Sequence, residues 1–135
     1  MTSVTISPVS RGRLIAYWIT TLLVVFVFGA GGVFDLMRPP QAVEIMAKLG
    51  YPAYLCVILG VWKILGAIVL VLPRTPRLKE WAYAGIIFDL TGAAASHYAV
   101  GDSPKDIVTP IIIALIAVAS WSLRPPSRRL LGPLV

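Results

Sequence analysis

Residues 14–34 read LIAYWITTLLVVFVFGAGGVF, a run of 21 residues without a charged side chain. A helix needs about 20 mainly apolar residues to cross the hydrocarbon core of a bilayer. Three further stretches have similar length and character, at residues 54–72, 81–99 and 107–123. Because a backbone in lipid must satisfy its own hydrogen bonds, we expect each stretch to be helical. The sequence predicts one all-α membrane domain over residues 1–135, with four transmembrane helices.

The composition agrees with this assignment. Of the 135 residues, 58% are apolar and 13% are charged, and the mean hydropathy is +0.85. Soluble domains carry roughly 25% charged and about 45–50% apolar residues. These values argue against a soluble enzyme, a nucleic-acid-binding module and a disordered chain. The lipid bilayer is therefore the expected partner, and nucleic acid is not.

Basic residues in the loops predict the orientation, because Lys and Arg collect on the cytoplasmic side of a membrane. One side carries eight of them: Arg11, Arg13, Arg74, Arg77, Lys79, Arg124, Arg128 and Arg129. The other side carries three: Arg38, Lys48 and Lys105. We therefore expect an integral protein of a bacterial inner (plasma) membrane, with both termini in the cytoplasm. The net charge of +6 has the same origin.

Short loops predict an antiparallel four-helix bundle. The longest connection contains the amphipathic stretch 41–49 directly after Pro39 and Pro40, which suits a helix start. We expect a short helix there, either on the membrane interface or as a lid over the bundle. As an alternative, the first apolar stretch could be a signal peptide with a cleavage site near Gly29–Gly32, although its apolar run is long for one.

Two charged residues lie in the middle of predicted spans. Lys63 has nine span residues on either side, and Asp89 lies at a similar depth in the next span. A charge there is costly, so a functional polar site is the default interpretation. Both residues share a helix face with small residues, which permit close helix contact in membranes: Gly60, Gly66 and Ala67 with Lys63, and Gly85, Gly92, Ala93 and Ser96 with Asp89. We expect Lys63 and Asp89 to form an ion pair. This pair either belongs to a functional site or fixes the register of the two helices.

A second polar layer is expected nearer the outer side. His97 lies two helical turns beyond Asp89, and Asp35 ends the first span on the same side. This predicts catalytic candidates Lys63, Asp89 and His97. Candidate ligand-binding residues are Asp35, Tyr83, Ser96 and Glu80, of which Glu80 lies at the cytoplasmic edge among basic residues. Each also has a structural interpretation, as a buried pair, a helix end or an interfacial ion pair.

Metal and cofactor sites are not expected. The chain has one histidine and one cysteine, Cys56, without a ligand pair at helical spacing. It has no flavin, haem or nicotinamide motif, and Gly29–Gly32 lies in a span where it would pack helices. Electron transfer would therefore require a partner protein that carries the cofactor.

The residues named above resemble the DoxX-like family. The most specific part of the resemblance is the string WAYAG at 81–85, followed by Asp89 and His97, within a likeness over roughly residues 14–126. The resemblance implies a four-helix membrane bundle. The family takes its name from a small subunit of a thiosulfate:quinone oxidoreductase, but no catalytic residue of that enzyme can be matched to a position here. A quinone substrate would rest on analogy alone.

Three functions remain open. The first is a small intramembrane enzyme that carries out acid–base or quinone-linked redox chemistry on a lipid-soluble substrate. The second is a non-catalytic subunit or assembly factor that binds another membrane protein or a second copy of itself. The third is a transporter of a small solute or of protons. A closed apolar cavity that contains Lys63, Asp89 and His97 and holds an elongated, lipid-like molecule would favour the enzyme. A solid core without room beside the Lys63–Asp89 pair would favour the subunit, and a continuous polar path to both surfaces would favour the transporter.

Overall fold

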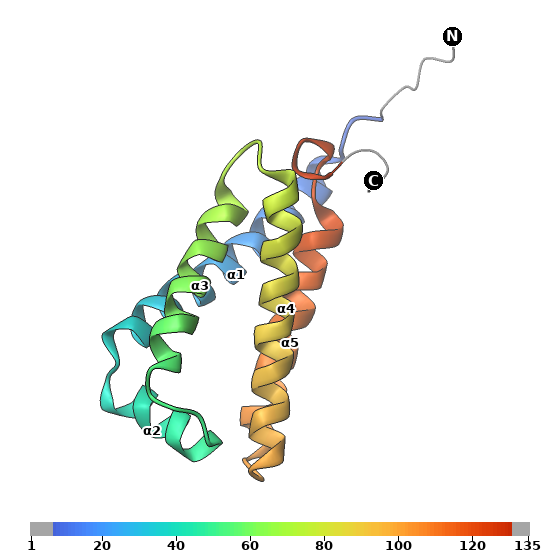
Figure 1. Ribbon diagram of the computed structural model, residues 1–135. Helices are drawn as coiled ribbons and strands as arrows, with labels where there is room; N and C mark the ends of the chain where they lie inside the picture. The colour runs from blue at the N-terminus through green and yellow to red at the C-terminus, as the bar shows by residue number, and fades with distance from the viewer. Residues whose placement is uncertain (1–6, 131–135) are drawn as a thin grey trace.

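The computed structural model describes residues 7–130, and this part of the chain is all-α, as the sequence predicts (Figure 1). Its helices are α1 (Arg11–Met37), α2 (Pro40–Leu49), α3 (Leu55–Val71), α4 (Pro76–Ala99) and α5 (Pro104–Leu123), followed by a short 3₁₀ helix η1 (Pro126–Arg128). Each of the four apolar stretches lies largely within one long helix, and α2 coincides with the amphipathic stretch 41–49.

The helix boundaries follow from local chemistry. The Ser10 side chain caps α1 by accepting a hydrogen bond from the Arg13 backbone N–H at 3.2 Å. α2, α4 and α5 each begin at a proline, whose missing N–H has no helical partner at that position. α2 ends at Gly50, which has a φ of +83° that favours glycine.

Two helices, α1 and α5, are long and apolar enough to cross a membrane. α3 is as apolar but has 17 residues. α4 is longer, at 24 residues, and carries charged residues along its length, including Lys79, Glu80 and Asp89. Large apolar side chains also cover the outside of the described helices, as on Phe26, which is 72% exposed. Such a surface suits lipid rather than water.

The helices form two limbs (Figure 1). α1 packs along α3, and α4 packs along α5. The limbs meet mainly through α1 and α5, whereas α3 and α4 share a smaller contact. They lie close at the terminal end, where α1 begins and α5 ends, and diverge toward the opposite end, here called the α2 end. The core between them includes Val24, Phe28, Leu70, Ile86 and Ala117.

A glycine pair sets the distance between α1 and α3. A Cβ atom on Gly32 would lie 2.9 Å from the carbonyl oxygen of Gly60, and one on Gly60 would lie 2.8 Å from that of Gly32. The two backbones are therefore in direct contact, as small residues permit. The expectation that Gly66 and Gly85 also mediate close helix contact is wrong, because a Cβ atom on either would have no neighbour within 4 Å.

Candidate functional site

The open space beside Gly66 and Gly85 belongs to a cleft between α3 and α4. Its volume is about 510 Å³, and its walls are mostly apolar. Trp62, Trp81 and Phe88 lie at its rim and are 67%, 75% and 74% exposed. The cleft therefore opens sideways, onto the apolar surface of the helices. Lys63 and Asp89 both line it, one on each wall.

The partner of Lys63 is Asp35 on α1, so the predicted Lys63–Asp89 pair is wrong. The Lys63 Nζ atom lies 2.8 Å from Asp35 Oδ2 and donates a hydrogen bond to it. Helical side chains lean toward the N-terminus of their helix, and for α3 this is the α2 end. Asp35 lies near that end of α1, one turn beyond Gly32. The close contact of Gly32 with Gly60 brings the two helices within reach of this pair.

Asp89 has a different environment from Asp35. It is half-buried on the α4 wall of the cleft. Within residues 7–130, its carboxyl group makes no hydrogen bond and lies within 4.0 Å of no basic side chain. The charged groups that influence it electrostatically are Lys63, on the facing wall of the cleft, and Asp35 on α1. The cleft thus holds one paired ammonium group and one carboxyl group without a direct partner.

His97 does not lie beside Asp35, contrary to the expected second layer. Its Nδ1 donates to Asp102 Oδ2 at 2.6 Å, and Lys48 on α2 forms an ion pair with the same carboxylate. We call these three residues the Asp102 cluster. The hydrogen bond from His97, and then that from Lys48, lowers the pKa of Asp102. The hydrogen bond to Asp102 in turn raises the pKa of Lys48.

Ser96 belongs to the same end of the molecule. Its hydroxyl lies 2.7 Å from that of Tyr51, which follows α2. Together with the Asp102 cluster, this contact joins α2 and the segment after it to the α4–α5 limb. Neither His97 nor Ser96 lines the cleft. Their positions are suited to holding the limbs together at the α2 end, rather than to contact with a molecule bound beside Asp89.

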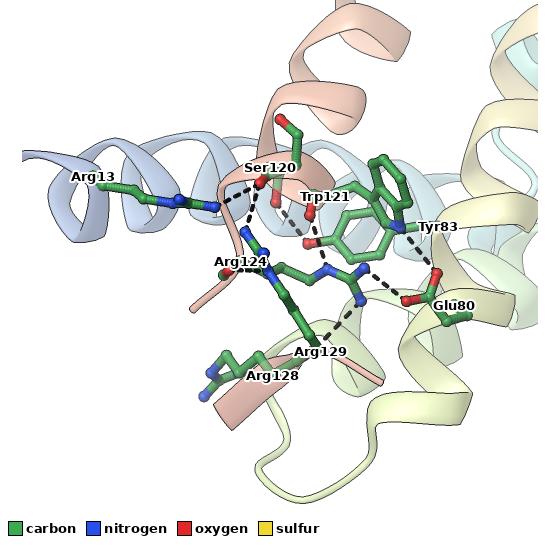
Figure 2. A network of polar contacts seen from close by, with 9 residues as sticks. Arg13, Glu80, Tyr83, Ser120, Trp121, Arg124, Arg128 and Arg129 are labelled. Carbon is green, nitrogen blue, oxygen red and sulfur yellow. Dashed lines mark hydrogen bonds and ion pairs between the residues drawn. The ribbon is translucent and has the colours of Figure 1, made fainter. Parts of the chain in front are cut away.

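Glu80 and Tyr83 belong to a polar network at the terminal end (Figure 2). Arg124 donates to Glu80 Oε1 at 2.7 Å, and the Trp121 indole donates to Glu80 Oε2 at 2.9 Å. The Tyr83 hydroxyl lies 2.7 Å from that of Ser120, which contacts Thr21 at 2.6 Å. These bonds join α1, α4 and α5. Glu80 and Tyr83 are therefore placed to brace the bundle, away from the α3–α4 cleft.

Sequence reasoning missed the central role of Arg124. The count of loop charges includes Arg124, whereas its side chain is 4% exposed and its guanidinium group lies over the Tyr83 ring, 5.2 Å from the ring centroid. The Arg124–Glu80 pair does have a signal in the sequence. Arg124 directly follows an apolar stretch, and Glu80 lies near the start of the preceding helix. Such a fully paired arginine at a helix end supports structure.

Two other basic residues cap α3 at the same end. Lys79 is 1% exposed and donates hydrogen bonds to the carbonyl oxygens of Val69, at 2.5 Å, and Leu72. Arg128 donates to the carbonyl oxygen of Leu70 at 3.1 Å. The last carbonyl groups of a helix have no partner within the helix, and cations there also interact favourably with its dipole. Lys79 and Arg128 therefore satisfy the carbonyl groups at the C-terminal end of α3.

The one cysteine of the chain lies outside the α3–α4 cleft. Cys56 is free and buried, and its Sγ lies 3.9 Å from the Ala42 carbonyl oxygen, where α3 meets α2. Among residues 7–130, no three His, Cys, Asp or Glu side chains are grouped closely enough to hold a metal ion.

The described residues form helices with an apolar outer surface, most of their charged groups lie near helix ends, and Lys63 and Asp89 lie in one cleft. This combination has the character of a helical membrane protein. Comparison with known families agrees: the profile of the DoxX-like family matches residues 19–120. The chain belongs to the DoxX-like family of membrane proteins, whose environment is the lipid bilayer. The match includes both walls of the cleft. Searches of curated proteins and of solved structures found no match.

Proposed function

We propose that α1, α3, α4 and α5 all span the membrane as an antiparallel bundle and that α2 lies on the outer interface. The apolar outer surface and the helix lengths support this arrangement. The excess of loop Lys and Arg at the terminal end supports an inner membrane location with cytoplasmic termini. Lys79 and Arg128, which cap α3, would then lie at the cytoplasmic surface.

We further propose that the protein takes up a lipid-soluble small molecule in the α3–α4 cleft, and that Asp89 contacts the polar group of this molecule and takes up or releases a proton as it binds. One observation carries this proposal: Asp89 is a carboxyl group without a direct partner, in a mostly apolar cleft that opens sideways. A titratable group in such a cavity is a typical candidate for a functional site. The side opening gives a lipid-soluble molecule a path from the bilayer.

The two charged residues of the cleft have different roles in this proposal. Asp89 is the acid–base group, because its carboxyl group is free to accept or donate a proton. Lys63 is held by Asp35, which compensates its charge and fixes it on the wall of the cleft that faces Asp89. His97 and Ser96 hold the α2 end together, and Glu80 and Tyr83 brace the terminal end. The catalytic candidates are thereby reduced to Asp89 and Lys63.

The cleft also bears on the alternatives. A non-catalytic subunit would be favoured by a solid core beside Lys63, and the cleft occupies that position. A redox role would need a cofactor-bearing partner, and nothing on the walls of the cleft is specific for one. We therefore prefer a protein that acts by itself on a lipid-soluble molecule.

The test is to fill the cleft. A leucine at Gly85 would occupy it, because Gly85 lines the cleft and a Cβ there has open space. Gly92→Leu is the matched control: it lies two turns further along α4, is exposed and does not line the cleft. We expect native mass spectrometry of the protein in lipid nanodiscs to detect a co-purified small molecule in the wild type and in Gly92→Leu, and to lose it in Gly85→Leu. Equal retention by both variants would contradict the proposal.

A further inference from the structure

We infer that the α3–α4 cleft selects an amphiphilic organic cation, which binds Asp89 in exchange for a proton. This inference rests on the proposed function, because it names the class of ligand that the same cleft would accept.

The charges at this depth do not balance. Asp35 and Asp89 contribute two carboxyl groups, and Lys63 contributes one ammonium group that is already paired with Asp35. α5 carries its charged residues near its ends, at Lys105 and Asp106 and after its last turn at Arg124, so it adds no compensating charge. An ionised Asp89 would therefore leave one negative charge unmatched in a low-dielectric region. A proton or a bound cation would neutralise it.

The balance of charges around Asp89 also disfavours an anionic ligand. An anion would add a second unmatched negative charge, and the ammonium group that could have bound it is held at 2.8 Å by Asp35. A neutral ligand would leave the proton on Asp89. A cation is the class of ligand that can replace this proton without leaving any charge uncompensated.

The walls of the cleft suit an organic cation better than a hydrated metal ion. Trp62, Trp81 and Phe88 surround the mouth, and aromatic faces attract ammonium groups. The remaining lining is largely aliphatic and contacts apolar groups, as at Leu59, Leu65 and Val69. A volume of about 510 Å³ accommodates a small organic molecule. An inorganic cation would lose its water shell there and gain oxygen ligands from Asp89 alone among the acidic residues that line the cleft.

The exchange is balanced. In the empty cleft, the Asp89 carboxyl group carries a proton. A permanent cation entering from the bilayer forms an ion pair with the carboxylate, and the proton leaves to water. No covalent bond to the ligand forms or breaks, and the net charge of the cleft stays the same.

The experiment compares a permanent cation with a neutral molecule of similar size. Tritiated benzyldimethyloctylammonium and octylphenol are titrated onto the protein in zwitterionic nanodiscs, with empty nanodiscs subtracted. The variants are Asp89→Asn, Asp89→Glu, Gly85→Leu and the control Asp106→Asn, whose carboxyl group lies at the exposed start of α5. Helicity and monodispersity of each variant are measured first.

We expect the wild type to bind the cation saturably, with a proton released on binding and with affinity falling as the pH is lowered. Asp89→Asn should weaken cation binding by at least about tenfold, since it removes the neutralising charge. Asp89→Glu should retain most of it, Asp106→Asn should match the wild type, and octylphenol binding should change little in Asp89→Asn.

Two failures can be told apart. In the first, octylphenol binds the wild type but not Gly85→Leu, while the cation does not bind or binds Asp89→Asn as well as the wild type. The ligand class is then wrong, and the cleft remains a binding site. If Gly85→Leu changes the binding of neither probe, or neither probe binds, the proposed function fails together with this inference.

Discussion

Lys63 is paired with Asp35, whereas Asp89 has no direct partner. Substitutions of the paired residues and of Asp89 should therefore have different effects on stability. The pair joins α1 to α3, with side chains that are 11% and 23% exposed for Asp35 and Lys63. Removing one partner leaves the other charge without compensation, whereas removing both can be almost neutral. Asp89 has no such partner within the described chain, so its substitution should affect ligands rather than stability.

Lys63→Met should therefore destabilise the protein, by up to about 3–5 kcal/mol if Asp35 remains ionised. The double variant Lys63→Met with Asp35→Asn should recover most of that loss. Asp89→Asn alone should leave stability unchanged or raise it slightly. Thermal unfolding followed by circular dichroism in detergent measures all three. If Asp89→Asn is as destabilising as Lys63→Met, the assignment of the pair is wrong.

The sequence indicated which charged residues lie inside the apolar stretches but not how they pair. Lys63 and Asp89 stand out because charges are rare in an apolar span. Their depth suggested a direct contact. The actual partner depends on the direction in which the Lys63 side chain leans and on the backbone contact at Gly32, and both are consequences of tertiary packing. His97 likewise finds Asp102, a loop residue that hydropathy alone treats as unremarkable surface.

At the level of elements, the contact of α1 with α3 differs in kind from that of α3 with α4. The first is close because two glycines face each other, and the second is open although glycines line both walls. Small residues therefore permit close packing here without causing it. The glycines that face the cleft widen it and leave room for a ligand.

Gly32→Ala should destabilise the protein by about 1–3 kcal/mol, the usual cost of overpacking a close contact. The added Cβ would lie 2.8 Å from Ile64 Cγ1 and 2.9 Å from the Gly60 carbonyl oxygen, and backbone cannot yield easily. Gly31→Ala is the control, because a Cβ there meets nothing within 4 Å. It should be neutral or stabilising through helix propensity. Equal unfolding temperatures for the two variants would refute the close contact.

Two polar contacts link the α2 region to the α4–α5 limb. The Asp102 cluster links α2 itself, and the Tyr51–Ser96 contact links the segment that follows α2. The low pKa of Asp102, due to His97 and then Lys48, means that its folded-state contacts contribute stability above the usual aspartate pKa of 3.8. This contribution is lost as the pH falls through the lower folded value. α2 should therefore separate from the α4–α5 limb only in strong acid.

Asp102→Asn should produce the same separation at neutral pH. Spin labels at the exposed positions Glu44 on α2 and Lys105 on α5 report it as a longer or broader distance distribution. Asp106→Asn removes a nearby carboxylate that bonds Ser103 and should leave the distribution unchanged. An unchanged distribution in Asp102→Asn would show that the cluster does not hold α2.

For the molecule as a whole, hydropathy was sufficient for the all-α class and for the approximate position of every long helix. It could not predict the divergence of the limbs. A four-helix bundle with small residues on facing helices is compatible with a solid core, and only the tertiary arrangement shows that the space between Gly66 and Gly85 is open. The cleft is also what separates Lys63 from Asp89 and leaves one carboxyl group free.

A crystal structure from a lipidic mesophase would show whether the α3–α4 cleft holds a small molecule in a bilayer. We expect an elongated non-protein molecule between Trp62 and Trp81, with a polar atom within hydrogen-bonding distance of Asp89. Lys63 should remain paired with Asp35. Closure of α3 onto α4, with Gly66 against Gly85 and Asp89 paired with Lys63, would contradict the account and favour a structural role for both charges.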